Sequence, residues 1–420
     1  MQSVQVLTGA WYGDREVDLT FPDDWDINVI AYEKHPVLTQ DQLRQAFHEP
    51  IGSPRIAEIA QGQNSAVIIC DDLTRPTPSS EVIPFILEEL QEGGISEENI
   101  IFFMGFGCHR SMKHADLVKK LGEDTVRRFR VKQNELDDAY IYIGETSRGV
   151  PLHCNQWVVD CDVKIGVGGA WPHGTAAFSG GGKIVIPGVS NHKTISTAHG
   201  TMESGGNAGN VENEFRLNSE EAARMLGVNT TVITTLNDRR EITALFVGDL
   251  VDAHRAAVET SRVAYAVTPM NDADIVITTG YPRDHDLSYG QIGGWPMRHA
   301  SPEATRILVS SGDEGVCYHR AGIIGSRLRR EAENQEREER KPLVRSEDWD
   351  YILFSDAVGP MEVLESQPRA KLMDSWDEIL DMLKQIYRDQ KPKVAVYPSA
   401  AIAYPAEEGT EGLYQSVWSR

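Results

Sequence analysis

The sequence lacks the features that mark several large classes of protein. Its 420 residues include only five cysteines, at positions 70, 108, 154, 161 and 317, and none of them forms a CxxC pair. This usage argues against a disulfide framework or a structural zinc site and favours a reducing compartment. No apolar run approaches the ~18 residues of a membrane span, and the N-terminus has no basic segment followed by an apolar one. We therefore expect a cytoplasmic protein without a membrane partner.

Basic residues are also scarce. There are 41 Lys and Arg against 63 Asp and Glu, which gives a formal net charge of -22. Such a surface repels nucleic acid and anionic membranes, so binding of a phosphate backbone is not expected as the main function. A chain of this charge that handles an anionic substrate must hold it in a local basic site. The few Arg and Lys residues inside motifs are therefore informative.

Short apolar runs alternate with helix-like segments, which is typical of α/β proteins. We expect strands at 66–70, 100–104, 139–143, 163–167, 273–278, 305–310, 351–354 and 393–397, helices at 81–92, 112–121 and 253–264, and a hairpin or adjacent strands within 227–248. The length exceeds one ordinary core. The sequence predicts two α/β domains, residues 1–267 and 268–420, with an active-site cleft between them. The charged run 326–341 is expected to be a solvated helix.

Polar motifs follow three of the predicted strands. Asp71 and Asp72 follow the first and lead into Arg75, whose planar guanidinium suits a carboxylate or phosphate. His109 follows the second strand after a glycine-rich turn and can transfer a proton near neutral pH. Because open α/β sheets bind ligands at the carboxyl ends of their strands, these loops should converge. An Asx-type turn with a surface Arg, and a purely structural His, remain open as alternatives.

The third motif, FSGGGKIVIPG, is the most distinctive. Three glycines before Lys183 let the backbone approach a ligand closely and form an anion-binding nest. It is not a P-loop, because Ala177 and Ile184 stand where that pattern needs Gly and Ser or Thr. A lysine in apolar surroundings has a lowered pKa and suits covalent attachment of a ligand. The alternative is a flexible linker with a surface lysine. A fourth motif contains His199, which alone does not select a metal.

Together and in this order, DDLTRPTP, GFGCHR, PHGTAAFSGGGKIVIPG and His199 resemble the nickel-dependent lactate racemase family of 2-hydroxy-acid racemases and epimerases. The match covers the N-terminal two-thirds of the chain, and the GGGK segment is its most specific part. Gly280-Tyr281-Pro282 and the segment after it fit the second domain of the family more loosely.

The resemblance implies a nickel-pincer nucleotide, which is pyridinium-3-thioamide-5-thiocarboxylic acid mononucleotide with Ni, attached covalently through Lys183. It implies His199 as the metal ligand from the protein, and cofactor-synthesis enzymes as partners. The other implied cofactor contacts are Asp72, Ser179, Gly180, Gly181 and Gly182. His109 and His173 would flank a 2-hydroxy acid as alternating acid and base, and Arg75 would pair with its carboxylate. Hydride would leave C2 for the cofactor and return to the other face.

The expected substrate contacts depart from the family. Lactate racemases carry a Gln and a Lys after the GYP region, where Tyr289 and Ile292 stand here, with Gln291 close by. Large polar groups crowd the segment, namely Arg283, His285, Trp295, Arg298 and His299. We expect Tyr289, Gln291, Trp295 and Arg298 to contact substrate. These side chains favour a sugar acid or a dicarboxylic hydroxy acid over lactate.

Two other functions remain possible from the sequence. A nucleotide or sugar-acid binding protein would use the GGGK loop without turnover, but it would need neither His109 nor His173. An NAD-type oxidoreductase is disfavoured, because no GxGxxG follows a strand and opens a helix with an acidic residue ~20 residues further on.

Overall fold

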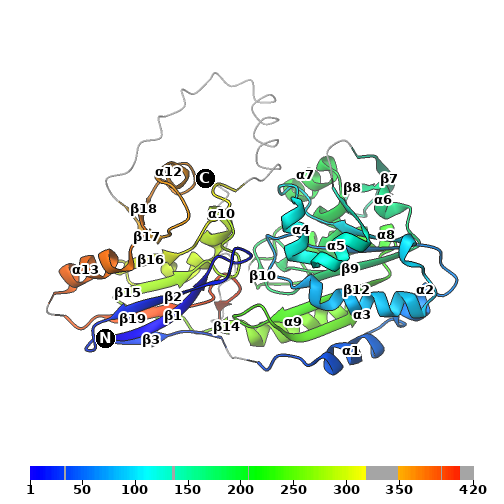
Figure 1. The fold of residues 1–420 in the computed structure, drawn as a ribbon. Helices are drawn as coiled ribbons and strands as arrows, with labels where there is room; N and C mark the ends of the chain where they lie inside the picture. Colours follow the sequence, from blue (N-terminus) through cyan, green and yellow to red (C-terminus); the bar gives the residue numbers. More distant parts are fainter. Residues whose placement is uncertain (33–34, 135–137, 207, 318–348, 389, 407–420) are drawn as a thin grey trace, which may run out of the picture. The chain divides into compact units, whose positions relative to one another are not determined.

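The structure is a computed structural model that describes residues 1–32, 35–134, 138–206, 208–317, 349–388 and 390–406 (Figure 1). The described chain divides into two compact units. One contains residues 35–264, and the other contains residues 1–32, 265–317 and 349–406. Each unit is built on a six-stranded sheet with helices, which confirms the predicted α/β class. The charged run 326–341 lies outside the described residues.

The unit of residues 35–264 has a sheet with the strand order β13-β12-β9-β4-β5-β6. Its strands are β4 (Ala66–Cys70), β5 (Ile100–Met104), β6 (Arg130–Gln133), β9 (Val163–Gly169), β12 (Thr230–Leu236) and β13 (Ile242–Gly248). All neighbours are parallel except β12 and β13, which form a hairpin, one of the two arrangements expected there. Every residue of β4, β5 and β9 is buried, as expected for parallel strands covered on both faces.

The helices of this unit pack on that sheet. They are α1 (Gln40–His48), α2 (Ile56–Ala60), α3 (Ser79–Glu92), α4 (His114–Leu121), α5 (Glu123–Arg128), α6 (Gln156–Val159), α7 (His192–Thr201), α8 (Glu214–Leu226) and α9 (Asp252–Ala264), with short turns η1 (Glu97–Asn99), η2 (Gly181–Ile184) and η3 (Val185–Val189). Two small hairpins complete it, β7 (Tyr140–Glu145) with β8 (Pro151–Asn155) and β10 (Pro172–His173) with β11 (Ala177–Phe178). Val67, Ile69 and Phe103 of the sheet share one apolar core with Phe215 of α8.

The strand register sets the place of the motifs. Cys70, the last residue of β4, lies opposite Met104 at the end of β5 and opposite Val167 of β9. The ladder continues one step, because Asp71 N–H donates to the carbonyl of Val167 at 3.3 Å and Gly105 N–H donates to that of Cys70 at 2.8 Å. The loops after β4 and β5 therefore start at the same level, and β9 continues two residues further to Gly169, so all three loops leave the same edge of the sheet, as predicted.

The other unit has a parallel sheet with the order β18-β17-β16-β15-β19-β3. Its elements are β1 (Gln2–Thr8), β2 (Arg15–Phe21), β3 (Asp26–Val29), β14 (Ala266–Val267), β15 (Ile275–Thr279), α10 (Leu287–Gly290), η4 (Gln291–Arg298), β16 (Thr305–Val309), β17 (Tyr351–Phe354), α12 (Pro360–Ser366), β18 (Ala370–Met373), α13 (Trp376–Tyr387), β19 (Lys393–Tyr397) and β20 (Tyr404–Pro405). The four strands predicted after residue 272 are β15, β16, β17 and β19.

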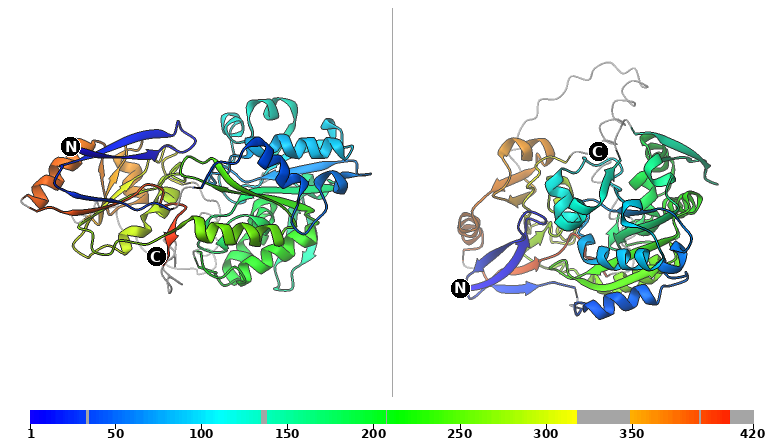
Figure 2. Two further views of the ribbon diagram at one scale, coloured as in Figure 1. Left: turned by 90° about the horizontal axis from the view of Figure 1, so that it is seen from below. Right: turned by 45° about the vertical axis from the view of Figure 1, so that its right-hand side comes forward.

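The first 32 residues belong to this second unit, which differs from a single division of the chain at residue 267. Strand β3 pairs with β19, and Trp376 of α13 donates its indole N–H to the carbonyl of Thr20 at 3.0 Å. The hairpin β1–β2, blue in Figures 1 and 2, thus lies beside the orange helix α13. Partners more than 350 residues apart leave no local pattern, so the sequence did not reveal this pairing. No helix in the described part of the chain has the length and apolar character of a membrane span.

Candidate active site

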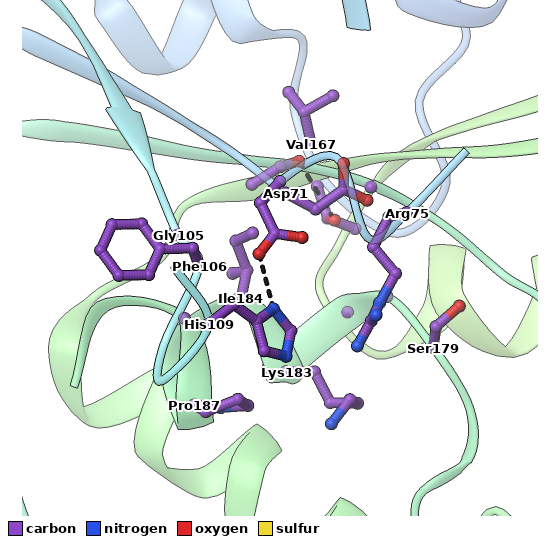
Figure 3. Close-up of a pocket in the computed structure, with 17 residues that line it drawn as sticks. Asp71, Arg75, Gly105, Phe106, His109, Val167, Ser179, Lys183, Ile184 and Pro187 are labelled. Atoms are coloured by element: carbon purple, nitrogen blue, oxygen red, sulfur yellow. Dashed lines mark hydrogen bonds and ion pairs between the residues drawn. The ribbon is translucent and has the colours of Figure 1, made fainter. Parts of the chain in front are cut away.

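A cavity opens where the loops after β4, β5 and β9 meet (Figure 3). About 530 Å³ of the hollow is not filled by protein atoms, a volume that includes open solvent. Among the predicted site residues, its lining contains Asp72, Arg75, His109, Ser179, Gly180, Gly181 and Lys183. In Figure 3 the side chains of Arg75, His109 and Lys183 extend toward the same space. The loops thus bring together a titratable imidazole and two cationic side chains.

Asp72 orients the imidazole of His109. Its Oδ2 lies 2.6 Å from His109 Nδ1, and both side chains are buried. A proton on Nδ1 that bonds to the carboxylate leaves the lone pair on Nε2, which is the form that accepts a proton from a ligand. Burial opposes the charge of Asp72, but His109, Arg75 and the hydroxyl of Thr74 outweigh it and hold the pKa of Asp72 well below its usual range.

This placement adds a role for Asp72 to the expected cofactor contact. Its Oδ1 also accepts the backbone N–H of Thr74 at 3.0 Å, so the Asx-type turn left open by the sequence is present. Arg75 donates to the hydroxyl of Thr74 at 2.8 Å. The turn and the carboxylate–imidazole pair are therefore one hydrogen-bonded structure, and the two interpretations of the motif do not exclude each other.

The loop that carries His109 is fixed by close backbone packing. Gly107 has a φ of +60°, and its N–H donates to the carbonyl of Gly188 at 3.1 Å. A Cβ on Gly107 would lie 2.9 Å from the Cβ of Pro187, which is too close for any side chain. The GFGCHR motif therefore needs this glycine in order to dock on the PG pair that ends the GGGK segment.

Buried side chains of α8 and α9 hold the GGGK loop in place. Arg216 of α8 is fully buried and donates to the carbonyl oxygens of Gly180, at 2.7 Å, and Phe178. His254 of α9 donates from Nε2 to the carbonyl of Ser179 at 2.8 Å. Burial lowers the pKa of Arg216 to about 10, so it stays protonated at neutral pH. Burial and the nearby Arg216 keep the pKa of His254 well below its usual value, so this imidazole is neutral.

Arg216 and His254 were not expected from the sequence. The only local sign of Arg216 is a charged residue on a helix face that also carries Ser219 and Ala223, and His254 stands in an ordinary amphipathic helix. Neither residue belongs to a recognisable motif. Both donate hydrogen bonds to backbone carbonyl oxygens that lie about 36 to 75 residues away in sequence.

The glycines of the loop are required by packing on α8 and α9. A Cβ on Gly181 would approach the His254 ring at 3.0 Å, and one on Gly182 would lie 2.6 Å from the carbonyl oxygen of Ser219. Lys183, in the turn η2, has only 8% of its surface exposed. These contacts exclude the flexible linker with a surface lysine. They place Lys183 on a rigid, buried turn.

Lys183 and His199 both contact one aromatic ring. Lys183 Nζ is 4.9 Å from the centre of the Phe215 ring, and the His199 ring centre is 4.8 Å from it. His199, in the last turn of α7, bonds through Nδ1 to the carbonyl of Ile195 at 2.9 Å. Burial, helped by the charge of Lys183, lowers the pKa of His199 to about 4. The imidazole is thus neutral with its lone pair on Nε2, which is the form that ligates a metal.

The protein alone offers few ligands for a metal. No group of three or more His, Cys, Asp or Glu side chains among the described residues is arranged to hold an ion. A nickel ion bound through His199 would need most of its ligands from another molecule. The neutral His199 beside Lys183 fits a cofactor that brings its own donor atoms.

His173 is not among the residues that line this cavity. It lies in β10, half-buried, and its Nδ1 accepts the backbone N–H groups of Thr175 at 3.1 Å and Ala176 at 3.3 Å. The hydroxyl of Ser179 donates to the carbonyl of Gly169 at 2.5 Å and accepts the N–H of Trp171 at 3.1 Å, so its hydrogen bonds hold the loop together.

The four expected substrate contacts lie in the other unit, on α10 and η4. Tyr289 and Gln291 are half-buried, and Arg298 is exposed. Trp295 is 3% exposed and donates its indole N–H to the carbonyl of Ala400 at 2.9 Å. This donor is used inside the protein, so Trp295 packs the unit instead of offering a hydrogen bond to a ligand. Asp286 caps α10 by accepting the N–H groups of Ser288 and Tyr289.

Comparisons with known proteins agree on one family. Residues 12–210 match the lactate racemase N-terminal domain. A lactate racemase of Lactiplantibacillus plantarum is 30% identical over 286 residues, which cover 66% of this chain and 67% of that protein. A lactate racemase of Thermoanaerobacterium thermosaccharolyticum is 27% identical over 311 residues, 71% of this chain and 72% of that protein.

Solved structures show the same fold. The lactate racemase apoprotein from Thermoanaerobacterium thermosaccharolyticum has a TM-score of 0.73 at 20% identity, covering 97% of this chain and 100% of that one. A protein from Thermotoga maritima has a TM-score of 0.61 at 16% identity, covering 89% of this chain and 100% of that one.

The packing of the GGGK loop predicts that Gly182→Ala destabilises the protein. The added Cβ would meet the backbone of α8, and overpacking of this kind costs about 1–3 kcal/mol, or roughly 5 °C in Tm. Gly200→Ala is the matched control, because Gly200 is helical and no atom lies within 4 Å of the place that a Cβ would occupy there. Thermal unfolding of the two variants checks this. Equal Tm values would contradict a tight fit of the loop on α8.

Proposed function

Because this chain belongs to the lactate racemase family, we propose that it inverts C2 of a 2-hydroxy acid, with a nickel-pincer nucleotide attached to Lys183. One observation carries the proposal: a carboxylate-oriented imidazole, an arginine and a buried lysine line a single cavity. A pure binding protein has no need of the Asp72–His109 pair. Racemisation of a hydroxy acid needs a base for the hydroxyl proton and a cation for the carboxylate.

The residues present fit the proposed cofactor. Lys183 stands on a rigid turn, where a covalent link would be held in one place, and His199 presents a neutral imidazole that contacts the same Phe215 ring. Gly180 and Gly181 line the cavity and would lie beside the nucleotide, whereas Gly182 packs against α8. When bound, the nickel nucleotide would supply the acceptor and donor of the hydride that leaves and rejoins C2.

The protein would supply the proton chemistry. His109 Nε2 would take the hydroxyl proton of the substrate, and Asp72 would stabilise the imidazolium that forms, since its carboxylate already contacts Nδ1. Arg75 would hold the substrate carboxylate by a bidentate contact. We propose His173 as the acid and base for the opposite hydroxyl geometry, because a single fixed base serves one enantiomer poorly.

The proposed substrate is larger and more polar than lactate. Tyr289 and Ile292 replace the Gln and Lys of lactate racemases, and neither can repeat the contact of a lysine. Tyr289, Gln291 and Arg298 offer hydrogen-bond donors suited to additional hydroxyls or to a second carboxylate. We therefore propose a sugar acid or a dicarboxylic hydroxy acid.

Cofactor attachment is tested by mass spectrometry and metal analysis of protein made together with the cofactor-synthesis enzymes. The expected result is an adduct on the Lys183 peptide and about one nickel per chain, in line with a single attachment site. Lys183→Arg is the control and should carry no adduct. An unmodified Lys183 without nickel, while a lactate racemase loads in the same cells, would favour a nucleotide or sugar-acid binding protein.

The role of the Asp72–His109 pair is tested with Asp72→Asn in the loaded enzyme. The amide cannot stabilise the imidazolium and permits the wrong tautomer, so kcat should fall by about 10²- to 10⁴-fold with little change in KM. The control is Asp138→Asn, because Asp138 does not line the cavity. Asp71→Asn is unsuitable as a control, because Asp71 does line it. A normal kcat in Asp72→Asn would refute the proposed function of the pair.

Substrate choice is tested with a panel of D- and L-lactate, malate, tartrate and gluconate. Inversion is followed by chiral chromatography. We expect a higher kcat/KM for a dicarboxylate or a sugar acid than for lactate, because each further hydrogen bond contributes about 0.5–1.5 kcal/mol, or about 1.5–3 kcal/mol where one partner is charged. Lactate as the best substrate would remove the case for a larger acid while leaving the racemase proposal intact.

A further inference from the structure

Lys120 is a buried cation next to the cavity, and it belongs to none of the sequence motifs. It lies on α4, and none of its surface is exposed. Lysines are almost never fully buried unless they are paired. Its Nζ lies 2.6 Å from Oδ1 of Asp71 and donates to the carbonyl oxygen of Arg75 at 3.0 Å. One side chain therefore contacts both the first carboxylate of the DDLTRPTP loop and the backbone of its arginine.

Asp71 is held from both of its oxygens. Lys120 contacts Oδ1, and the hydroxyl of Thr77 donates to Oδ2 at 2.6 Å. Arg75 N–H also donates to the carbonyl of Asp72 at 3.1 Å. The two ends of the turn from Asp71 to Thr77 are thus joined through the Asp71 carboxylate. Lys120 holds the backbone between them by its hydrogen bond to the carbonyl of Arg75. The position of the Arg75 side chain depends on this turn.

The ion pair of Asp71 and Lys120 also balances charge at the cavity wall. Asp71 and Asp72 both line the cavity, and an anionic substrate would be repelled by two uncompensated carboxylates. Asp72 contacts His109, and Asp71 contacts Lys120. Burial raises the pKa of Asp71 and lowers that of Lys120, so each needs the other in order to stay ionised. With both carboxylates compensated, the guanidinium of Arg75 can attract an anion.

We propose that Lys120 is a positioning residue for the substrate carboxylate: through Asp71 and the carbonyl of Arg75, it fixes the turn that presents the Arg75 guanidinium to the ligand. The proposal rests on the proposed function, because it takes the ligand to be a hydroxy acid bound at Arg75. It assigns Lys120 no contact with the reacting atoms. Its loss should therefore weaken binding of a carboxylate more than it slows the chemical step.

The test compares Lys120→Met, the double variant Asp71→Asn/Lys120→Met and the control Lys119→Met in the nickel-loaded enzyme. Lys119 is the neighbouring lysine on the same helix, and it is only half-buried. KM and kcat are measured with the best acid of the panel. The dissociation constant of oxalate, a planar dicarboxylate that resembles a 2-keto acid, is measured by titration calorimetry.

Lys120→Met should raise KM and the oxalate dissociation constant about tenfold, while kcat changes by less than about threefold. The single variant leaves a buried carboxylate without its counter-ion and should also lose thermal stability. The double variant removes both charges and should recover most of the Tm, yet it should keep the raised KM, because the contact to the Arg75 carbonyl is still missing. Lys119→Met should match the wild type.

Two results would overturn the proposal. A double variant with wild-type KM and oxalate affinity would mean that Lys120 is only a counter-ion. A folded Lys120→Met with unchanged oxalate affinity would leave it no role in binding. If Lys120→Met does not fold, the double variant decides alone. Absence of racemisation of every acid by the wild type would count against the proposed function, whereas the oxalate affinities would still decide the role of Lys120.

Discussion

The register of three parallel strands determines the rest of the site. Cys70 lies opposite Met104 on one side and Val167 on the other, so the loops that follow β4, β5 and β9 leave the same edge of the sheet. A shift of one residue in β4 would turn its side chains to the opposite faces of the sheet. The positions of Asp72, His109 and the GGGK loop relative to one another depend on this hydrogen-bonded alignment, which the apolar cores on both faces of the sheet stabilise.

Around that edge the protein buries several charged groups. Asp72 contacts His109, Asp71 contacts Lys120, and Arg216 donates to the carbonyls of the GGGK loop. A buried charge costs free energy unless it is paired and hydrogen-bonded, so such groups contribute less to stability than apolar side chains of similar size would. What they provide is a fixed geometry. Backbone that would otherwise be adaptable is held in one conformation beside the cavity.

The local features of the site could be predicted from the sequence, because they depend on residues that are close together along the chain. The strands predicted at 66–70 and 100–104 are present, and the one predicted at 163–167 runs on to Gly169. Their loops converge as predicted, and β12 and β13 form a hairpin, one of the two arrangements expected within 227–248. The contact of Asp72 with His109 was not predicted, although both residues had been selected, because only the fold shows that they are neighbours. Trp295 was expected to face a ligand, but its indole N–H is used by the carbonyl of Ala400.

The sequence by itself determined the α/β class, the order of the elements and the candidate residues in the motifs, since apolar periodicity and glycine placement are local signals. The tertiary structure alone decided which partners these residues have. Three buried side chains contact the site from about 36 to 75 residues away in the sequence, namely Lys120, Arg216 and His254. Strand β3, near the start of the chain, pairs with β19, near its end. Such contacts follow from the packing of whole elements, and no window of neighbouring residues contains the information that specifies them.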